Sequence, residues 1–132
     1  MLQLIIRTPI LLYKNMDYKS IGNQIMNLDP KIRFVTIIDI NDGMILFSEH
    51  GPGVTNLLTK EESDQSLAFT LSAWKIRSAL KKQLGKGKFV LAEYEKIKRI
   101  SMPLDEDHLL YITTEVECDA LSFINKIKNV KL

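Results

Sequence analysis

Cysteine is nearly absent from this chain of 132 residues, in which Cys118 stands alone. A single cysteine cannot close an intramolecular disulfide, and it excludes the small zinc modules that depend on paired C-x-x-C motifs. Histidine is almost as scarce, because only His50 and His108 occur, and neither has a second ligand at the spacing of a known metal motif. We therefore expect no disulfide, no metal ion and no cofactor.

The chain also lacks any apolar run long enough to cross a bilayer. Residues 1–15 are rich in leucine and isoleucine, but Arg7 and Pro9 interrupt them and no small-residue cleavage site follows. We expect a cytoplasmic protein with no membrane span. Residues 1–15 are interpreted either as an extension upstream of a start at Met16 or as an apolar arm packed on the domain or on a neighbour. Residues 16–132 are long enough for one domain with its own core.

Glycine and proline are few, and most of them mark the ends of predicted elements. Asp29-Pro30 ends a helix that Asp17 can cap, because the residue before proline avoids helical geometry. Asn41-Asp42-Gly43 is typical of a hairpin turn, since glycine accepts a positive φ. Thr59 and Glu62 have the spacing of a capping box at the start of a long helix. The predicted elements are a helix over 17–28, strands over 32–40 and 44–48, a helix over 60–84, strands over 88–94, 97–102 and 108–114, and a helix over 119–130.

This order of elements, α-β-β-α-β-β-β-α, predicts an α/β protein of the α+β type. Strands joined by short turns pair antiparallel, so we expect a five-stranded antiparallel sheet. One long helix and two terminal helices would flank it.

The long helix is predicted to have two apolar faces. A narrow stripe is bordered by basic residues on both sides, as an interface core with a polar rim would be. A broader stripe lacks bordering charge on one side and suits the chain's own sheet. We therefore expect the narrow stripe to contact a partner, with Trp74 as its anchor; the alternative is that the terminal helices or the N-terminal arm cover it. The narrow stripe holds Leu67, Leu71, Trp74 and Ser78, and the broad stripe holds Phe69, Ala73, Ile76, Leu80 and Leu84.

Positive charge is concentrated in one segment. Lys75 to Arg99 holds nine basic residues against Glu93 and Glu95, a local balance of +7 in a chain of net charge +2. Such asymmetry can steer an acidic partner, although amphipathic elements also need solvated faces. The predicted patch for an acidic partner consists of Lys75, Arg77, Lys81 and Lys82.

Motifs for catalysis and for nucleic acids are absent. Gly85-Lys86-Gly87-Lys88 resembles a phosphate loop only superficially, because its glycines leave a helix and enter a strand rather than the reverse. Asp105-Glu106-Asp107-His108 is explained by a polar hairpin turn. No RNP-like or helix-turn-helix pattern occurs. We expect neither an enzyme nor a specific nucleic-acid-binding protein.

The hairpin FVTIIDINDGMILFSE, the capped long helix and the segment KFVLAEYEKIKRISMPLDEDHLLYITTE resemble the roadblock (dynein light-chain) family within the longin/profilin-like folds. The likeness covers residues 17–130. It implies a non-enzymatic regulatory or scaffold module that forms a homodimer through the long helix and the strand after it. The implied interface adds Phe89 and Leu91 to the narrow stripe, and the implied partners include a small Ras-like GTPase.

Two other functions remain open from the sequence. A PAS-like sensory domain would bind a small ligand in its core, and it shares two strands before and three after the helical segment. A longin domain of membrane traffic would continue into a coiled coil.

Overall fold

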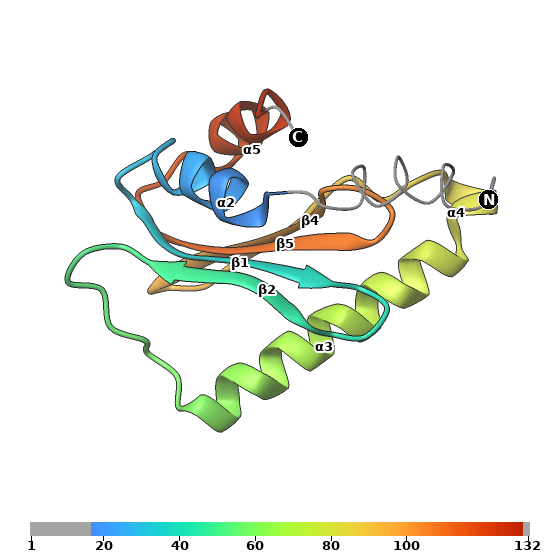
Figure 1. Ribbon diagram of the computed structural model, residues 1–132, viewed down its shortest axis with the longest axis horizontal. Coiled ribbons are helices and arrows are strands. Elements are labelled where there is room, and N and C mark those ends of the chain that lie inside the picture. Colours follow the sequence, from blue (N-terminus) through green and yellow to red (C-terminus); the bar gives the residue numbers. More distant parts are fainter. Residues whose placement is uncertain (1–16, 131–132) are drawn as a thin grey trace, which may run out of the picture.

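The computed structural model describes residues 17–130 as three layers, with a five-stranded sheet between two short helices and one long helix (Figure 1). The predicted apolar arm, residues 1–15, lies outside the described residues. Within the described range, no helix combines the length and the apolar character needed to cross a membrane.

The sheet is antiparallel throughout, as predicted, with strand order β2-β1-β5-β4-β3. The central strands β1 and β5 come from distant parts of the chain, while β1–β2, β3–β4 and β4–β5 are hairpins. Gly43 makes the first hairpin turn with a φ of +75°. The strands are β1 (Ile32–Asp39), β2 (Ile45–His50), β3 (Val90–Glu93), β4 (Ile97–Pro103) and β5 (His108–Glu115).

Two capped helices cover one face of the sheet: α2 (Tyr18–Met26) and α5 (Ala120–Lys128). Each begins as the sequence predicts, because an aspartate side chain accepts a bond from a backbone amide of the first turn. Asp17 Oδ1 accepts from Ser20 at 3.0 Å, and Asp119 Oδ1 accepts from Ser122 at 3.2 Å.

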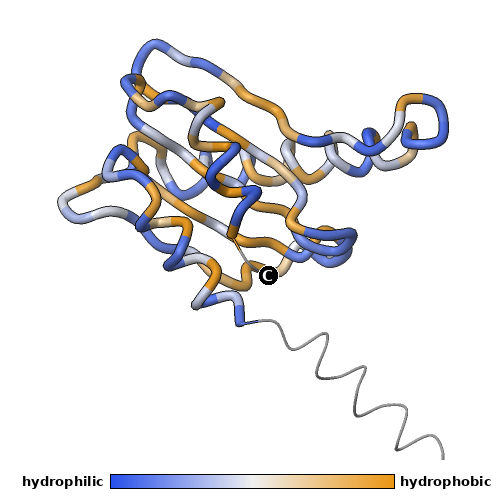
Figure 2. Tube along the Cα trace, turned by 90° about the horizontal axis from the view of Figure 1, so that it is seen from above, coloured by the Kyte–Doolittle hydropathy of each residue, from blue (hydrophilic) through white to orange (hydrophobic). Residues whose placement is uncertain are grey.

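The main hydrophobic core lies between these helices and the sheet. Alternate residues of β1, β4 and β5 point toward α2 and α5, and Figure 2 shows hydrophobic residues along the strands at the centre of the fold. Gly22 lets α2 approach closely, since a Cβ there would overlap the Phe47 ring. The fully buried members include Ile25, Val35, Ile37, Ile100, Leu110, Ile112, Phe123 and Ile124.

The opposite face of the sheet is polar at many positions and carries the long helix α3 (Lys60–Ala79). The predicted capping box is present: Thr59 Oγ1 accepts from the Glu62 amide at 3.1 Å, and Glu62 Oε1 accepts from the Thr59 amide at 2.9 Å. The helix is shorter than predicted, because it is interrupted at Leu80 and continues as the short α4 (Lys81–Leu84). Gly85, with a φ of +82°, ends α4. Figure 1 shows α3 diverging from the sheet toward its N-terminal end.

Candidate functional site

Trp74 fixes the orientation of α3 on the sheet. Its side chain is 5% exposed, and its indole Nε1 donates a hydrogen bond of 2.8 Å to Ser101 Oγ on β4. The Arg77 guanidinium lies 5.3 Å above the indole ring. Gly87 completes the enclosure, because a Cβ there would stand 2.8 Å from the indole Cζ3. The C-terminal half of α3 is therefore held by its own sheet and by the segment that follows α4.

This arrangement reverses the predicted roles of the two apolar stripes. Leu67 and Leu71 are half-buried on the same side as Trp74, so the narrow stripe faces the chain's own sheet. The expectation that this stripe would stay free for a partner is wrong. The physical reason is the hydroxyl of Ser101, which gives the indole N–H a buried acceptor.

The broader stripe instead faces outward. Within residues 17–130, its large side chains stay exposed, with exposed fractions of 74% for Phe69, 63% for Ile76, 44% for Leu80 and 79% for Leu84. We call these four residues the outer face of α3 and α4. The prediction of a helix with two apolar faces is confirmed, with the faces exchanged.

Among residues 17–130, the strand β3 forms one edge of the sheet and pairs only with β4. Leu91 stands opposite Ile100, whose side chain belongs to the core beneath α2 and α5, so Leu91 lies on the face remote from α3. Phe89 and Leu91 are each 37% exposed, and Ser78 is exposed. The predicted interface residues therefore do not form one continuous patch.

The predicted basic patch is also divided. Lys75 and Lys82 are exposed on α3 and α4. Lys81 is exposed as well, but with the half-buried Arg77 it lines a cavity of about 450 Å³ that also contains the chain's own acidic turn 105–107. The basic residues thus do not present a single surface to an acidic partner.

A larger cavity, of about 730 Å³, lies between the N-terminal half of α3 and the sheet. Sequence reasoning did not predict it. Of the residues that α3 contributes to its lining, Ser66 is small and points toward Arg99 and Tyr111 on the strands, so it fills little of the space between the helix and the sheet. The small Ser66 at an inward position of the long helix was the available signal.

His108 connects the β4–β5 turn to α2. Its Nδ1 donates to the Asp105 carboxylate at 2.7 Å, and its Nε2 forms a hydrogen bond of 2.8 Å with the Tyr18 hydroxyl. Burial raises the pKa of Tyr18, and the charges of Asp105, Asp39 and Asp107 raise it further. Among residues 17–130, no three potential ligands gather around a metal position. The histidine holds two elements together.

Comparison with known proteins identifies the architecture. No family model and no curated protein matches the chain. Among solved structures, a roadblock/LC7 domain from Streptomyces avermitilis matches with a TM-score of 0.65 at 12% identity, covering 87% of this chain and 92% of that one. The gliding protein MglB from Thermus thermophilus matches with a TM-score of 0.65 at 14% identity, covering 83% and 78%. A structure of MglB with a tetrameric arrangement gives 0.65 at 15% identity, covering 83% and 77%.

The chain has the roadblock fold. The resemblance found in the sequence is confirmed at this level, as is the predicted five-stranded sheet with its helices. At these identities the likeness concerns the fold alone. The architecture is therefore assigned to the roadblock fold rather than to a PAS-like domain.

Proposed function

We propose that the protein is a non-enzymatic regulatory or scaffold module that forms a homodimer and binds protein partners. The observation that carries this proposal is the outer face of α3 and α4, a row of large apolar side chains that stay exposed within residues 17–130. Contiguous exposed apolar surface on a small domain usually marks an interaction site.

The energy of burial supports a stable contact through this face. Covering one large apolar side chain is worth about 1.5–3 kcal/mol relative to leaving it in water. Phe69 and Ile76 both project from the middle of a regular helix, where a partner helix could cover them together. Lys75 is exposed next to Ile76 and would lie at the polar rim that such interfaces have.

The edge strand β3 offers a second point of contact. Its outer edge has no strand neighbour among the described residues, so its free N–H and C=O groups can pair with another strand. The family resemblance places dimer formation at the long helix and the strand after it, which are α3 and β3. The tetrameric arrangement of MglB is that protein's own, and it supports association of roadblock folds in general.

A small Ras-like GTPase is the partner class that the resemblance implies, and we include it in the proposal. The exposed Lys75 and Lys82 supply positive charge for an acidic partner surface. We place the module in the cytoplasm, because its one cysteine cannot form the internal disulfides that are typical of proteins in oxidising compartments.

Sedimentation velocity tests self-association directly. The wild-type chain, whose mass is 15.1 kDa, should sediment as a dimer. Ile76→Glu should sediment as a monomer, because two charges would be buried in the apolar contact. Leu121→Glu is the matched control, since Leu121 is an exposed leucine of α5 on the opposite side of the sheet. A monomeric wild type, or a dimer that survives Ile76→Glu, would refute the proposed interface.

Partner binding needs a separate experiment. Immobilised wild type is exposed to small Ras-like GTPases loaded with GDP or with a GTP analogue, and binding is followed by interferometry. Lys75→Glu with Lys82→Glu should weaken binding at low salt, whereas Lys126→Glu with Lys128→Glu should leave it unchanged. Absence of binding in both nucleotide states would remove the GTPase from the proposal and leave the dimer untouched.

A further inference from the structure

The cavity between the N-terminal half of α3 and the sheet has the size of a ligand site. Its volume of about 730 Å³ falls within the range of about 300–1,000 Å³ that is usual for small-molecule pockets. It is lined by α3, by the loop before it and by strands β1, β4 and β5. The wall is mostly apolar near Leu57, Leu58 and Ile97.

Arg99 lies on the inner wall of this cavity with its charge uncompensated. It forms no ion pair with any carboxylate of residues 17–130. Its Nη1 donates to Ser66 Oγ at 2.7 Å, while its buried Nε has no acceptor. A partly buried guanidinium without an anionic partner is costly, so the site favours an incoming anion.

Two tyrosine rings hold this guanidinium in place. The Arg99 Cζ lies 5.2 Å from the ring centre of Tyr111 and 5.8 Å from that of Tyr94. The Tyr111 hydroxyl is within 2.9 Å of Ser66 Oγ, which also accepts from Arg99. Arg99 is therefore positioned by contacts on several sides before any ligand arrives, which lowers the cost of ordering it.

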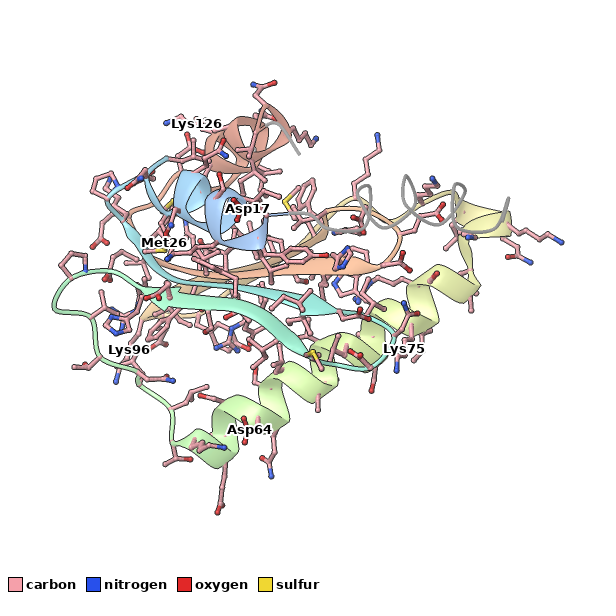
Figure 3. All side chains as sticks on the ribbon, in the orientation of Figure 1. Asp17, Met26, Asp64, Lys75, Lys96 and Lys126 are labelled. Atoms are coloured by element: carbon pink, nitrogen blue, oxygen red, sulfur yellow. The ribbon has the colours of Figure 1, made fainter. Side chains whose placement is uncertain are left out.

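The other charges of the cavity do not replace an anion at Arg99. Arg33 is already paired with Glu115 at 2.9 Å. The acidic residues of the wall, Glu62 and Glu95, are exposed at the rim, and Glu62 is committed to the capping box. Lys96 is exposed at the rim as well and adds a positive charge on the α3 side of the sheet (Figure 3).

We propose that this cavity binds a small amphipathic carboxylate, with the carboxylate on Arg99 and the apolar body along Leu57, Leu58 and Ile97. A carboxylate matches the fork of donors that a guanidinium presents. The site lies within one chain, so this inference goes beyond the proposed dimer and does not depend on it.

Isothermal titration with decanoate, below the concentration at which it forms micelles, tests the proposal. Decanoate should bind the wild type saturably at one site per chain. The affinity for 1-decanol, which has the same tail and no charge, should be lower by about tenfold or more. Arg99→Gln should weaken decanoate binding about tenfold and leave 1-decanol binding unchanged. Lys126→Gln also removes one positive charge, but on α5 across the sheet, and should bind decanoate like the wild type (Figure 3).

A second variant keeps the test decisive if Arg99→Gln fails to fold, which a thermal melt would reveal. Leu57 is 57% exposed at the mouth, so Leu57→Asp should fold normally and weaken decanoate binding by removing apolar contact and adding repulsion. No saturable binding to the wild type would overturn the proposal. Equal affinity for decanoate and 1-decanol would also overturn it, as would unchanged decanoate affinity in Leu57→Asp.

Discussion

Trp74 Nε1 and Ser101 Oγ form a hydrogen bond of 2.8 Å that is buried between α3 and β4. Together with the burial of the indole, this contact sets which side of a helix with two apolar faces meets the sheet. With the indole turned inward, Phe69, Ile76 and Leu80 are left outward. The candidate dimer surface is thus exposed because Trp74 packs against the polar face of the sheet and turns the other side of α3 outward.

Removing the indole should destabilise the fold rather than only free a partner site. We expect Trp74→Ala to lower the free energy of unfolding by about 3–5 kcal/mol, because a large buried side chain is lost and a cavity remains. Trp74→Phe should cost less, with about 1 kcal/mol from the lost hydrogen bond alone. Urea denaturation followed by circular dichroism measures both. A Trp74→Ala chain as stable as the wild type would contradict the buried position.

Gly87 should be intolerant of a side chain because of the same indole. A Cβ there would stand 2.8 Å from Trp74 Cζ3, so Gly87→Ala should lower the free energy of unfolding by about 1–3 kcal/mol. The change should cost less in a Trp74→Phe background, where the outer ring is gone. A double-mutant cycle by urea denaturation measures this coupling. Additive effects would show that the two residues do not touch.

Stability should decline in the alkaline range. Burial raises the pKa of the Cys118 thiol, and the nearby Asp29 carboxylate raises it further; the pKa of Tyr18 is raised in the same direction. Between the unfolded and the folded pKa, the native state binds more protons than the unfolded chain, so the free energy of unfolding falls as pH rises. The loss should begin near the ordinary pKa of a thiol and continue past that of a phenol.

Urea denaturation from about pH 7 to about pH 11, a range that spans both ordinary pKa values, measures this effect. Cys118→Ala should flatten the decline in its lower part and Tyr18→Phe in its upper part, because each removes one titrating group. A free energy of unfolding that stays level or rises over this range would contradict the raised pKa values of both groups.

The sequence predicted the elements well because their signals are local. Asp17 and Asp119 cap helices, Gly43 makes a turn, and Thr59 with Glu62 forms a capping box, each within a few residues of chain. The break at Leu80 was missed, because neither glycine nor proline marks it.

Which side of α3 packs on the sheet could not be predicted, since it depends on contacts between residues that are distant in the sequence. Trp74 bonds Ser101, and Ser66 bonds Tyr111. Both pairs are far apart in the sequence, and no sequence motif links their members. The bordering charge was also misleading. Arg77 lies beside the buried indole rather than at the rim of an interface, because its apolar stem can pack while its guanidinium stacks on the ring.

Distances between spin labels test the proposed dimer most directly. In a Cys118→Ser background, one label is placed at Lys75→Cys, beside the outer face of α3, and in a second sample at Lys126→Cys on α5 (Figure 3). Pulsed dipolar spectroscopy should show coupling between two chains, with a clearly shorter distance for position 75 than for position 126. Absence of coupling, or a shorter distance at position 126, would contradict the assignment of the outer face as the dimer contact.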